Sequence, residues 1–236
     1  MDWFVRFITS SIGQKVVMSL TGLFLISFLI VHLVGNFQLF LADEGKSFNT
    51  YAYFMTTNPI IGTISYGLYA GFLLHAIQGL ALWYRNKKAR GSEKYAVARV
   101  SAASKHAPGR ASTHAALLGS IILVFLGIHM GDFWYSMKFT DGIEAITYAD
   151  GGGQAVKNLY AKVSQSFAQP WIVIVYLISM VALAFHLMHG FWSAFQTLGL
   201  NHRKYTPLIK ALGVLFSIAV PIAYAAIPVY MYFRLT

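Results

Sequence analysis

The residues of this sequence that could do chemistry are a small set of histidines inside long apolar stretches. Five histidines share this setting: His32, His75, His129, His186 and His189. A polar side chain is costly to place in lipid, so an ionisable residue there is a candidate for function. Neutral imidazole is the usual axial ligand of haem iron. The histidines therefore predict a membrane protein that binds haem.

Composition supports the membrane setting and narrows the choice of cofactor. Of the 236 residues, 57% are hydrophobic and only 11% are charged, whereas a soluble domain carries about 25% charged residues. The sequence has no cysteine. Covalent c-type haem, thiolate-held iron–sulfur clusters and disulfides are excluded, because each needs cysteine sulfur. Haem b, which is not attached covalently, remains, and the length suits one transmembrane domain over residues 1–236.

Five stretches are long enough to cross a hydrocarbon core of about 30 Å, which takes roughly 20 apolar residues. They run from about Val16 to Leu41, Ile60 to Tyr84, His114 to Met137, Pro170 to Leu198 and Pro207 to Phe233. Pro59, Pro170 and Pro207 stand at or just before helix starts, where a missing N–H costs little, and Pro221 and Pro228 should kink the fifth helix. We expect an all-α membrane protein with five transmembrane helices, the first four of which form a haem-binding bundle.

The distribution of basic residues predicts the orientation. The N-terminus, the loop 85–110 and the turn 203–210 together carry about +11, and the segments expected on the other side carry about −1. Cytoplasmic segments are enriched in Lys and Arg. The N-terminus should therefore lie inside and the C-terminus outside, in a bacterial cytoplasmic membrane. This asymmetry also accounts for the net charge of +10, so we expect no nucleic-acid partner.

Depth in the membrane sorts four of the histidines into two pairs. The first and third helices run outward and carry His32 and His129 in their outer halves; Asp43 follows His32 by 11 residues, or about 16 Å of helix. The second and fourth helices run inward and carry His75 and His186 in their inner halves. Imidazoles at equal depth on two helices can coordinate one iron from opposite sides. The sequence therefore predicts an outer haem on His32 and His129 and an inner haem on His75 and His186.

Small residues accompany the inner pair at helical spacing. The stripes are Gly71-x3-His75-x3-Gly79 in the second helix and Ala182-x3-His186-x3-Gly190 in the fourth. Residues four apart share a helix face, and small side chains let a flat macrocycle approach the backbone. Gly35 and Gly131 flank the outer pair less regularly. Any single histidine could instead be a hydrogen-bonded structural group, and the set of four at matched depths argues for ligation.

The remaining histidines have other expected roles. His189 is a rival to His186 as the inner ligand, or it bonds a haem propionate or simply packs. His106, His114 and His202 lie at or beyond the inner interface, where solvation or a propionate contact is expected. A zinc site or proton pump is disfavoured, because no carboxylate accompanies the buried histidines.

Two segments between the spans have apolar residues at helical spacing. After Gly151–Gly153 these residues are Val156, Leu159, Tyr160, Val163 and Phe167. The pattern predicts a short amphipathic helix on the outer membrane surface, and 48–55 could form another. An ordered loop is the alternative for each segment.

Several motifs resemble one family. They are Ser11-Ile-Gly-Gln-Lys-Val-Val-Met-Ser-Leu-Thr-Gly22, His32-Leu-Val-Gly-Asn36, Phe48-Asn-Thr-Tyr51, His75-Ala-Ile-Gln-Gly79, His129-Met-Gly-Asp-Phe-Trp134 and Phe185-His-Leu-Met-His-Gly-Phe-Trp192. They are spread over nearly the whole chain. The sequence resembles the cytochrome b membrane-anchor subunit of succinate dehydrogenase and fumarate reductase, in its single-chain, five-helix, di-haem branch. In that family the ligands come from the first four helices, and the second and fourth hold the inner haem.

The resemblance implies partners and a reaction. A flavoprotein subunit would oxidise succinate or reduce fumarate, and an iron–sulfur subunit on the inner face would exchange electrons with the two haems b of this chain. The chain would pass them to a quinone, commonly menaquinone in two-haem relatives. The assembled complex is an enzyme in which this chain is the electron-transfer and quinone-reactive subunit. The direction of the reaction, the quinone pocket and the oligomeric state stay open.

Other readings of the same residues remain. Asp132, beside His129, is a candidate proton relay at the outer end of the third helix, or a solvated helix-end carboxylate. A different anchor, such as the cytochrome b of a hydrogenase or formate dehydrogenase, would also need intramembrane histidine pairs. A transporter without redox chemistry is the alternative of another class.

Overall fold

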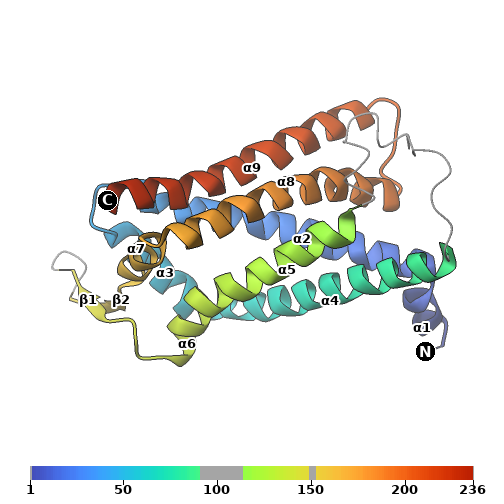
Figure 1. The fold of residues 1–236 in the computed structure, drawn as a ribbon. Helices are drawn as coiled ribbons and strands as arrows, with labels where there is room; N and C mark the ends of the chain where they lie inside the picture. Colours follow the sequence, from blue (N-terminus) through green and yellow to red (C-terminus); the bar gives the residue numbers. More distant parts are fainter. Residues whose placement is uncertain (1, 91–113, 149–152, 236) are drawn as a thin grey trace. The chain divides into compact units, whose positions relative to one another are not determined.

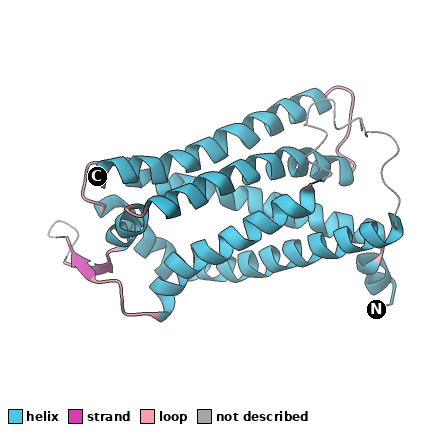
Figure 2. Cartoon of the chain, in the orientation of Figure 1, coloured by secondary structure: helices cyan, strands magenta, loops and turns pink. Residues whose placement is uncertain are grey.

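Residues 2–90, 114–148 and 153–235 are described by the computed structural model of the chain. Helices form nearly all of this part, and its strands are confined to one short hairpin (Figure 2). The long helices are α2 (Ser11–Asn36), α4 (Pro59–Arg90), α5 (Ala115–His129), α8 (Pro170–Thr197) and α9 (Thr206–Leu235). The shorter elements are α1 (Asp2–Thr9), the 3-10 helix η1 (Phe37–Phe40), α3 (Lys46–Thr57), the π-helix η3 (Met130–Tyr135), α6 (Ser136–Phe139), β1 (Ala145–Thr147), β2 (Ala155–Lys157) and α7 (Leu159–Phe167).

Five helical segments in the described part are long and apolar enough to cross a membrane. They are Ser11–Phe40, Pro59–Ala89, Ala115–Phe139, Pro170–Thr197 and Thr206–Arg234. Their outer faces carry large exposed apolar side chains, such as Ile77, Val124 and Leu215, each more than 60% exposed. Apolar surface on this scale is stable in lipid and not in water. The chain is an all-α, multi-pass membrane protein, as the composition predicted.

Most predicted helix limits agree with the structure. Helices α4 and α8 begin at Pro59 and Pro170, where the missing N–H costs little. Asn58 caps α4, because its Oδ1 accepts a hydrogen bond from the Ile60 backbone N–H at 3.0 Å. The predicted end of the second span at Tyr84 was too early: α4 continues to Arg90. Charged side chains ended the apolar pattern there without ending the helix, since Lys and Arg are good helix formers.

The chain divides into two compact units, and the division passes through each of the five long helices. The first unit comprises Met1–Phe28, Leu68–Ile121 and Ala182–Ala219, and the second comprises Leu29–Gly67, Ile122–Val181 and Val220–Thr236. The first unit contains His75, His186 and His189. His32 and His129 lie in the second. Each predicted pair therefore falls within one unit.

In the second unit the short elements α3, α7, β1 and β2 pack together, and we call them the cap (Figure 1). Within the cap, α3 contacts α7 and β2. Asn49 of α3 is 1% exposed. Its amide donates to the Tyr148 hydroxyl at 2.9 Å and to Asn158 Oδ1 at 3.1 Å, and its Oδ1 accepts the Tyr160 backbone N–H at 2.8 Å. One buried amide therefore joins α3, the start of α7 and the residue after β1.

The cap confirms two expected helices and corrects one of them. The segment 48–55 lies within α3, and 159–167 forms α7. Val156 was expected in the second helix but pairs with Ile146 in the β1–β2 hairpin. Val163 and Phe167 are buried against the protein, so the apolar face of α7 is a packing face of the second unit. Helical and strand spacing cannot be separated over so few residues.

The hydrogen bonds of the Asp43 carboxylate at the start of α3 can be tested by their pH dependence. Its carboxylate accepts the backbone N–H groups of Ser47 at 2.9 Å and Gly45 at 3.1 Å at the start of α3. Burial alone would raise the pKa of Asp43, but the hydrogen bonds from Ser47 and Gly45 outweigh it and lower the pKa below its ordinary value. Asp43→Ala should cost about 1 kcal/mol at neutral pH.

The sign of the pH dependence follows from the lowered pKa. The contribution is present above the unfolded-state pKa and is lost as the pH falls through the lower folded-state pKa. Thermal unfolding in detergent should therefore separate wild type from Asp43→Ala at pH 7 and separate them less in acid. Asp43→Asn, which accepts hydrogen bonds without titrating, should not show that convergence. A difference between wild type and Asp43→Ala that is the same at both pH values would contradict the assignment.

Candidate functional site

In the second unit the structure brings His32 and His129 together. Their ring centroids are 5.8 Å apart and their planes lie at 88°. His32 extends from α2 and His129 is the last residue of α5. Phe125, one turn earlier on α5, stacks on the His129 ring at 5.7 Å. The ring centroid of Tyr224 of α9 lies 5.9 Å from that of His32, so the fifth long helix, for which no role was predicted, also contributes to this pair.

In the first unit the structure brings His75 and His186 together. Their ring centroids are 6.1 Å apart with planes at 76°. His75 extends from α4 and His186 from α8. His189 lies one turn further along α8, so the ring beside His75 is that of the predicted partner and not of its rival.

These separations fit two imidazoles with one metal ion between them. A nitrogen–metal bond is about 2.0 Å long and a ring centroid lies about 1 Å behind the nitrogen, so axial ligands on opposite sides of a metal have centroids about 6 Å apart. Two histidines hydrogen-bonded directly, at about 2.9 Å between nitrogens, would have centroids about 5 Å apart. The observed 5.8 and 6.1 Å leave room for the first arrangement, and edge-to-face packing of two rings falls in the same range. Ligation itself stays a prediction.

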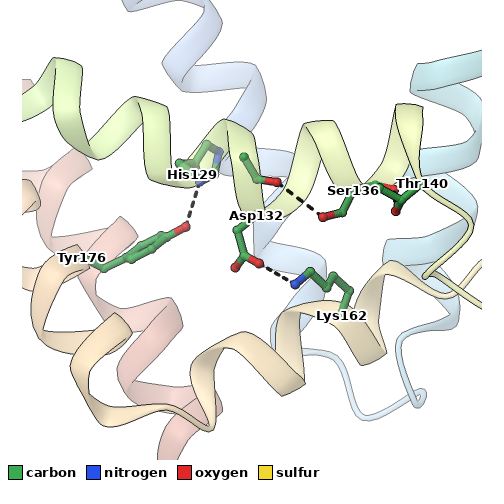
Figure 3. Close-up of polar contacts among 7 residues, drawn as sticks. His129, Asp132, Ser136, Thr140, Lys162 and Tyr176 are labelled. Carbon is green, nitrogen blue, oxygen red and sulfur yellow. Dashed lines mark hydrogen bonds and ion pairs between the residues drawn. The ribbon is translucent and has the colours of Figure 1, made fainter.

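Both pairs have a ring anchored through Nδ1. His129 Nδ1 is 2.9 Å from the Tyr176 hydroxyl (Figure 3), and His75 Nδ1 is 3.2 Å from the Thr21 hydroxyl. Metal-bound histidines usually engage the second ring nitrogen in a hydrogen bond, which fixes the ring orientation. Hydrogen bonds of this kind would equally satisfy a structural histidine.

The four histidines are half-buried residues of membrane-spanning helices. Zinc needs three or four protein ligands, and no group of three or more His, Cys, Asp or Glu side chains forms a metal site among residues 2–90, 114–148 and 153–235. A haem iron takes only its two axial ligands from the protein, so pairs suffice for it.

The glycines near His75 and His186 have different surroundings. A Cβ added at Gly71 would lie 3.2 Å from the Phe24 ring, and one added at Gly79 would lie 3.6 Å from the Met18 methyl group. The stripe on α4 therefore packs against side chains of α2 in this structure. A Cβ at Gly190 would meet nothing within 4 Å, so α8 keeps open space beside His186.

The small residues near His32 and His129 also differ from each other. A Cβ added at Gly35 would lie 2.4 Å from the Tyr51 ring, so this glycine accommodates a side chain of α3. Gly131 has no neighbour within 4 Å of such a Cβ.

Asp132 lies in a distorted helix directly after His129. The π-helix η3 widens this turn, and the Ser136 hydroxyl donates to the Gly131 carbonyl at 3.4 Å (Figure 3). The Asp132 carboxylate forms an ion pair with Lys162 of α7, and both side chains are about one-fifth exposed. Single-turn π-helices occur frequently at functional sites. The partnered, half-buried carboxylate differs from the freely solvated one that the alternative reading expected.

The peripheral histidines divide into described and undescribed residues. His202 Nδ1 accepts the Lys204 backbone N–H at 3.2 Å, and its ring lies beside Tyr205, which makes it part of the turn between α8 and α9. His114 is exposed at the residue before α5. His106 and most of the basic loop 85–110 lie outside the described residues.

Sequence reasoning missed Thr21, Tyr176 and Tyr224. Tyr176 is buried, with 7% exposure, and comes six residues after Pro170 on the fourth long helix, at the depth that the sequence predicted for His129. Matching the depths of hydroxyl groups as well as those of histidines would have found it.

No protein-family model, no curated protein and no solved structure matches the chain.

Proposed function

We propose that the chain is the di-haem b membrane-anchor subunit of a succinate:quinone oxidoreductase, which transfers electrons between an iron–sulfur subunit and a membrane quinone. The observation that carries the proposal is the separation of the two histidine pairs, 5.8 and 6.1 Å between ring centroids, in membrane-spanning helices. The resemblance of the motifs to the anchor family supports the choice among haem proteins.

The chain's own residues would hold the cofactors. His75 and His186 would be the axial ligands of the inner haem, and His32 and His129 those of the outer haem. Haem b bound in these places would supply one-electron carriers whose potential depends on the ligands and their burial. The helices keep each imidazole at a fixed height, and the Tyr176 hydroxyl holds the His129 ring through Nδ1 at 2.9 Å.

The partners follow from the resemblance. A flavoprotein subunit and an iron–sulfur subunit would dock on the cytoplasmic side of a bacterial membrane, to which the positively charged N-terminus and loops would belong. The quinone would be menaquinone, and succinate chemistry would take place on the flavoprotein. Lipid surrounds the five spans.

Asp132 is proposed as a proton relay for the quinone at the outer end. Quinone reduction takes up protons, and a carboxylate held by Lys162 beside an outer ligand is placed to pass them. Asp132→Asn should lower quinone turnover while both haems remain bound. Unchanged turnover would remove Asp132 from the reaction.

The test of the whole proposal is to isolate the chain from its native membrane together with what it binds. Copurification of a flavoprotein and an iron–sulfur protein, with succinate-dependent quinone reduction, is the expected result. A nickel-bearing partner would indicate a hydrogenase anchor, and a molybdenum- or tungsten-bearing partner a formate dehydrogenase anchor. A chain that contains no haem would favour the transporter reading.

A further inference from the structure

The Thr21 hydroxyl on α2 has three neighbours and one proton. Its Oγ1 is 2.8 Å from the Val17 carbonyl oxygen, 3.1 Å from the Met18 carbonyl oxygen and 3.2 Å from His75 Nδ1. A carbonyl oxygen only accepts, so the hydroxyl proton is directed to the backbone of its own helix. Toward His75 the hydroxyl oxygen must then accept. The proton in that hydrogen bond consequently belongs to His75 Nδ1.

A further contact places the same edge of the ring against α2. A Cβ added at Gly22 would lie 3.3 Å from His75 Cε1 and 3.7 Å from Nδ1. Thr21 and Gly22 therefore position the His75 ring together. The Thr21 hydroxyl fixes the ring through Nδ1, and the absence of a side chain at Gly22 leaves room for the ring edge.

We propose that Thr21 is a positioning residue that holds His75 as the neutral Nδ1–H tautomer and directs the lone pair of Nε2 away from α2. The inference rests on the proposed function, since Nε2 is then the atom that ligates the inner haem iron. A neutral imidazole has one protonated nitrogen and one with a lone pair. A hydrogen bond donated by Nδ1–H also makes the ring a stronger ligand. A ligand from α4 is thus oriented by a third helix, α2, that supplies no ligand to this haem.

The helix offers a matched control. Ser27 of α2 also bonds a carbonyl of its own helix, that of Phe24, at 2.7 Å. Its hydroxyl has no histidine partner within the described residues. Removing the two hydroxyl groups separately distinguishes contact with His75 from a general effect on α2.

The experiment uses the full-length chain purified with its haems. Thr21→Val keeps the branched shape and removes the hydroxyl, Thr21→Ser keeps the hydroxyl and removes a methyl group, and Ser27→Ala is the control. The readouts are haem per chain, the redox titration of each haem, and the low-spin electron paramagnetic resonance signal of the inner haem.

Thr21→Val should bind the inner haem about tenfold more weakly. At a fixed potential the remaining inner haem should be several-fold more ferrous, because a less basic ligand stabilises the ferric form less. Its resonance signal should shift, and the outer haem should stay unchanged. Thr21→Ser and Ser27→Ala should behave as the unsubstituted chain.

Two results would overturn the inference. The first is an unchanged inner haem in Thr21→Val. The second is a loss of inner haem from Thr21→Ser as large as that from Thr21→Val, which would show a packing role. Absence of haem from the unsubstituted chain would instead overturn the proposed function. Nitrogen resonances of labelled histidines in that same chain would then decide the role of Thr21. His75 should be the Nδ1–H tautomer and lose that preference in Thr21→Val; an Nε2–H ring in the unsubstituted chain would reject the role.

Discussion

Replacing His75 by alanine is expected to remove the inner haem and leave the outer one bound. The methyl group of alanine cannot ligate iron, and His186 alone offers one axial nitrogen where the pair offers two at a centroid separation of 6.1 Å. The haem content should fall from two per chain to one. Reduced-minus-oxidised spectra and a haem assay of the purified variant measure this, and the remaining spectrum should be that of the outer haem.

Two companion variants make the result specific. His129→Ala should give the reciprocal outcome, with the inner haem retained and the outer one lost. His189→Ala should retain both haems, because His186 and not His189 lies beside His75. Loss of only the outer haem from His75→Ala would show that the pairing is wrong, and loss of one haem from His189→Ala would transfer the ligand role to that residue.

Replacing Asn49 by alanine is expected to have the largest effect on stability. The side chain is 1% exposed and makes three hydrogen bonds, to Tyr148, Asn158 and the Tyr160 backbone. Each buried polar group left without a partner costs about 1–3 kcal/mol, so the variant should lose about 3 kcal/mol. Thermal or denaturant unfolding in detergent would show it.

The control for Asn49 lies on the same helix. Thr56 is exposed, and within the described residues its hydroxyl bonds only to α3 itself, at the Ala52 and Tyr53 carbonyls. Thr56→Ala should change the free energy of unfolding by less than about 0.5 kcal/mol. Equal losses from the two substitutions would mean that the Asn49 network does not stabilise the cap.

The sequence was informative wherever the membrane imposes a simple rule. Span positions follow from hydropathy, and Pro59 and Pro170 mark helix starts because proline is tolerated at a first helical residue. The pairing of His32 with His129 and of His75 with His186 required only helix direction and a rise of about 1.5 Å per residue. The structure places the rings of these pairs 5.8 and 6.1 Å apart, and their ligation of haem stays a prediction.

The rest depended on contacts between residues far apart in the chain. Nothing in the local sequence shows that Thr21 lies beside His75, 54 residues later, or that Gly35 accommodates Tyr51. Lys162 pairs with Asp132 because the cap returns α7 to the end of α5. Val156 was assigned to a helix because its strand partner, Ile146, is invisible to periodicity. These features are set by tertiary packing, which a single-sequence pattern does not encode.

Whether each pair of imidazoles ligates a haem iron is decided by the haem content of the purified, unsubstituted chain. We expect two haems b per chain, both six-coordinate and low-spin with two histidine ligands, and separable in a redox titration. A chain that purifies folded with no haem would contradict this expectation.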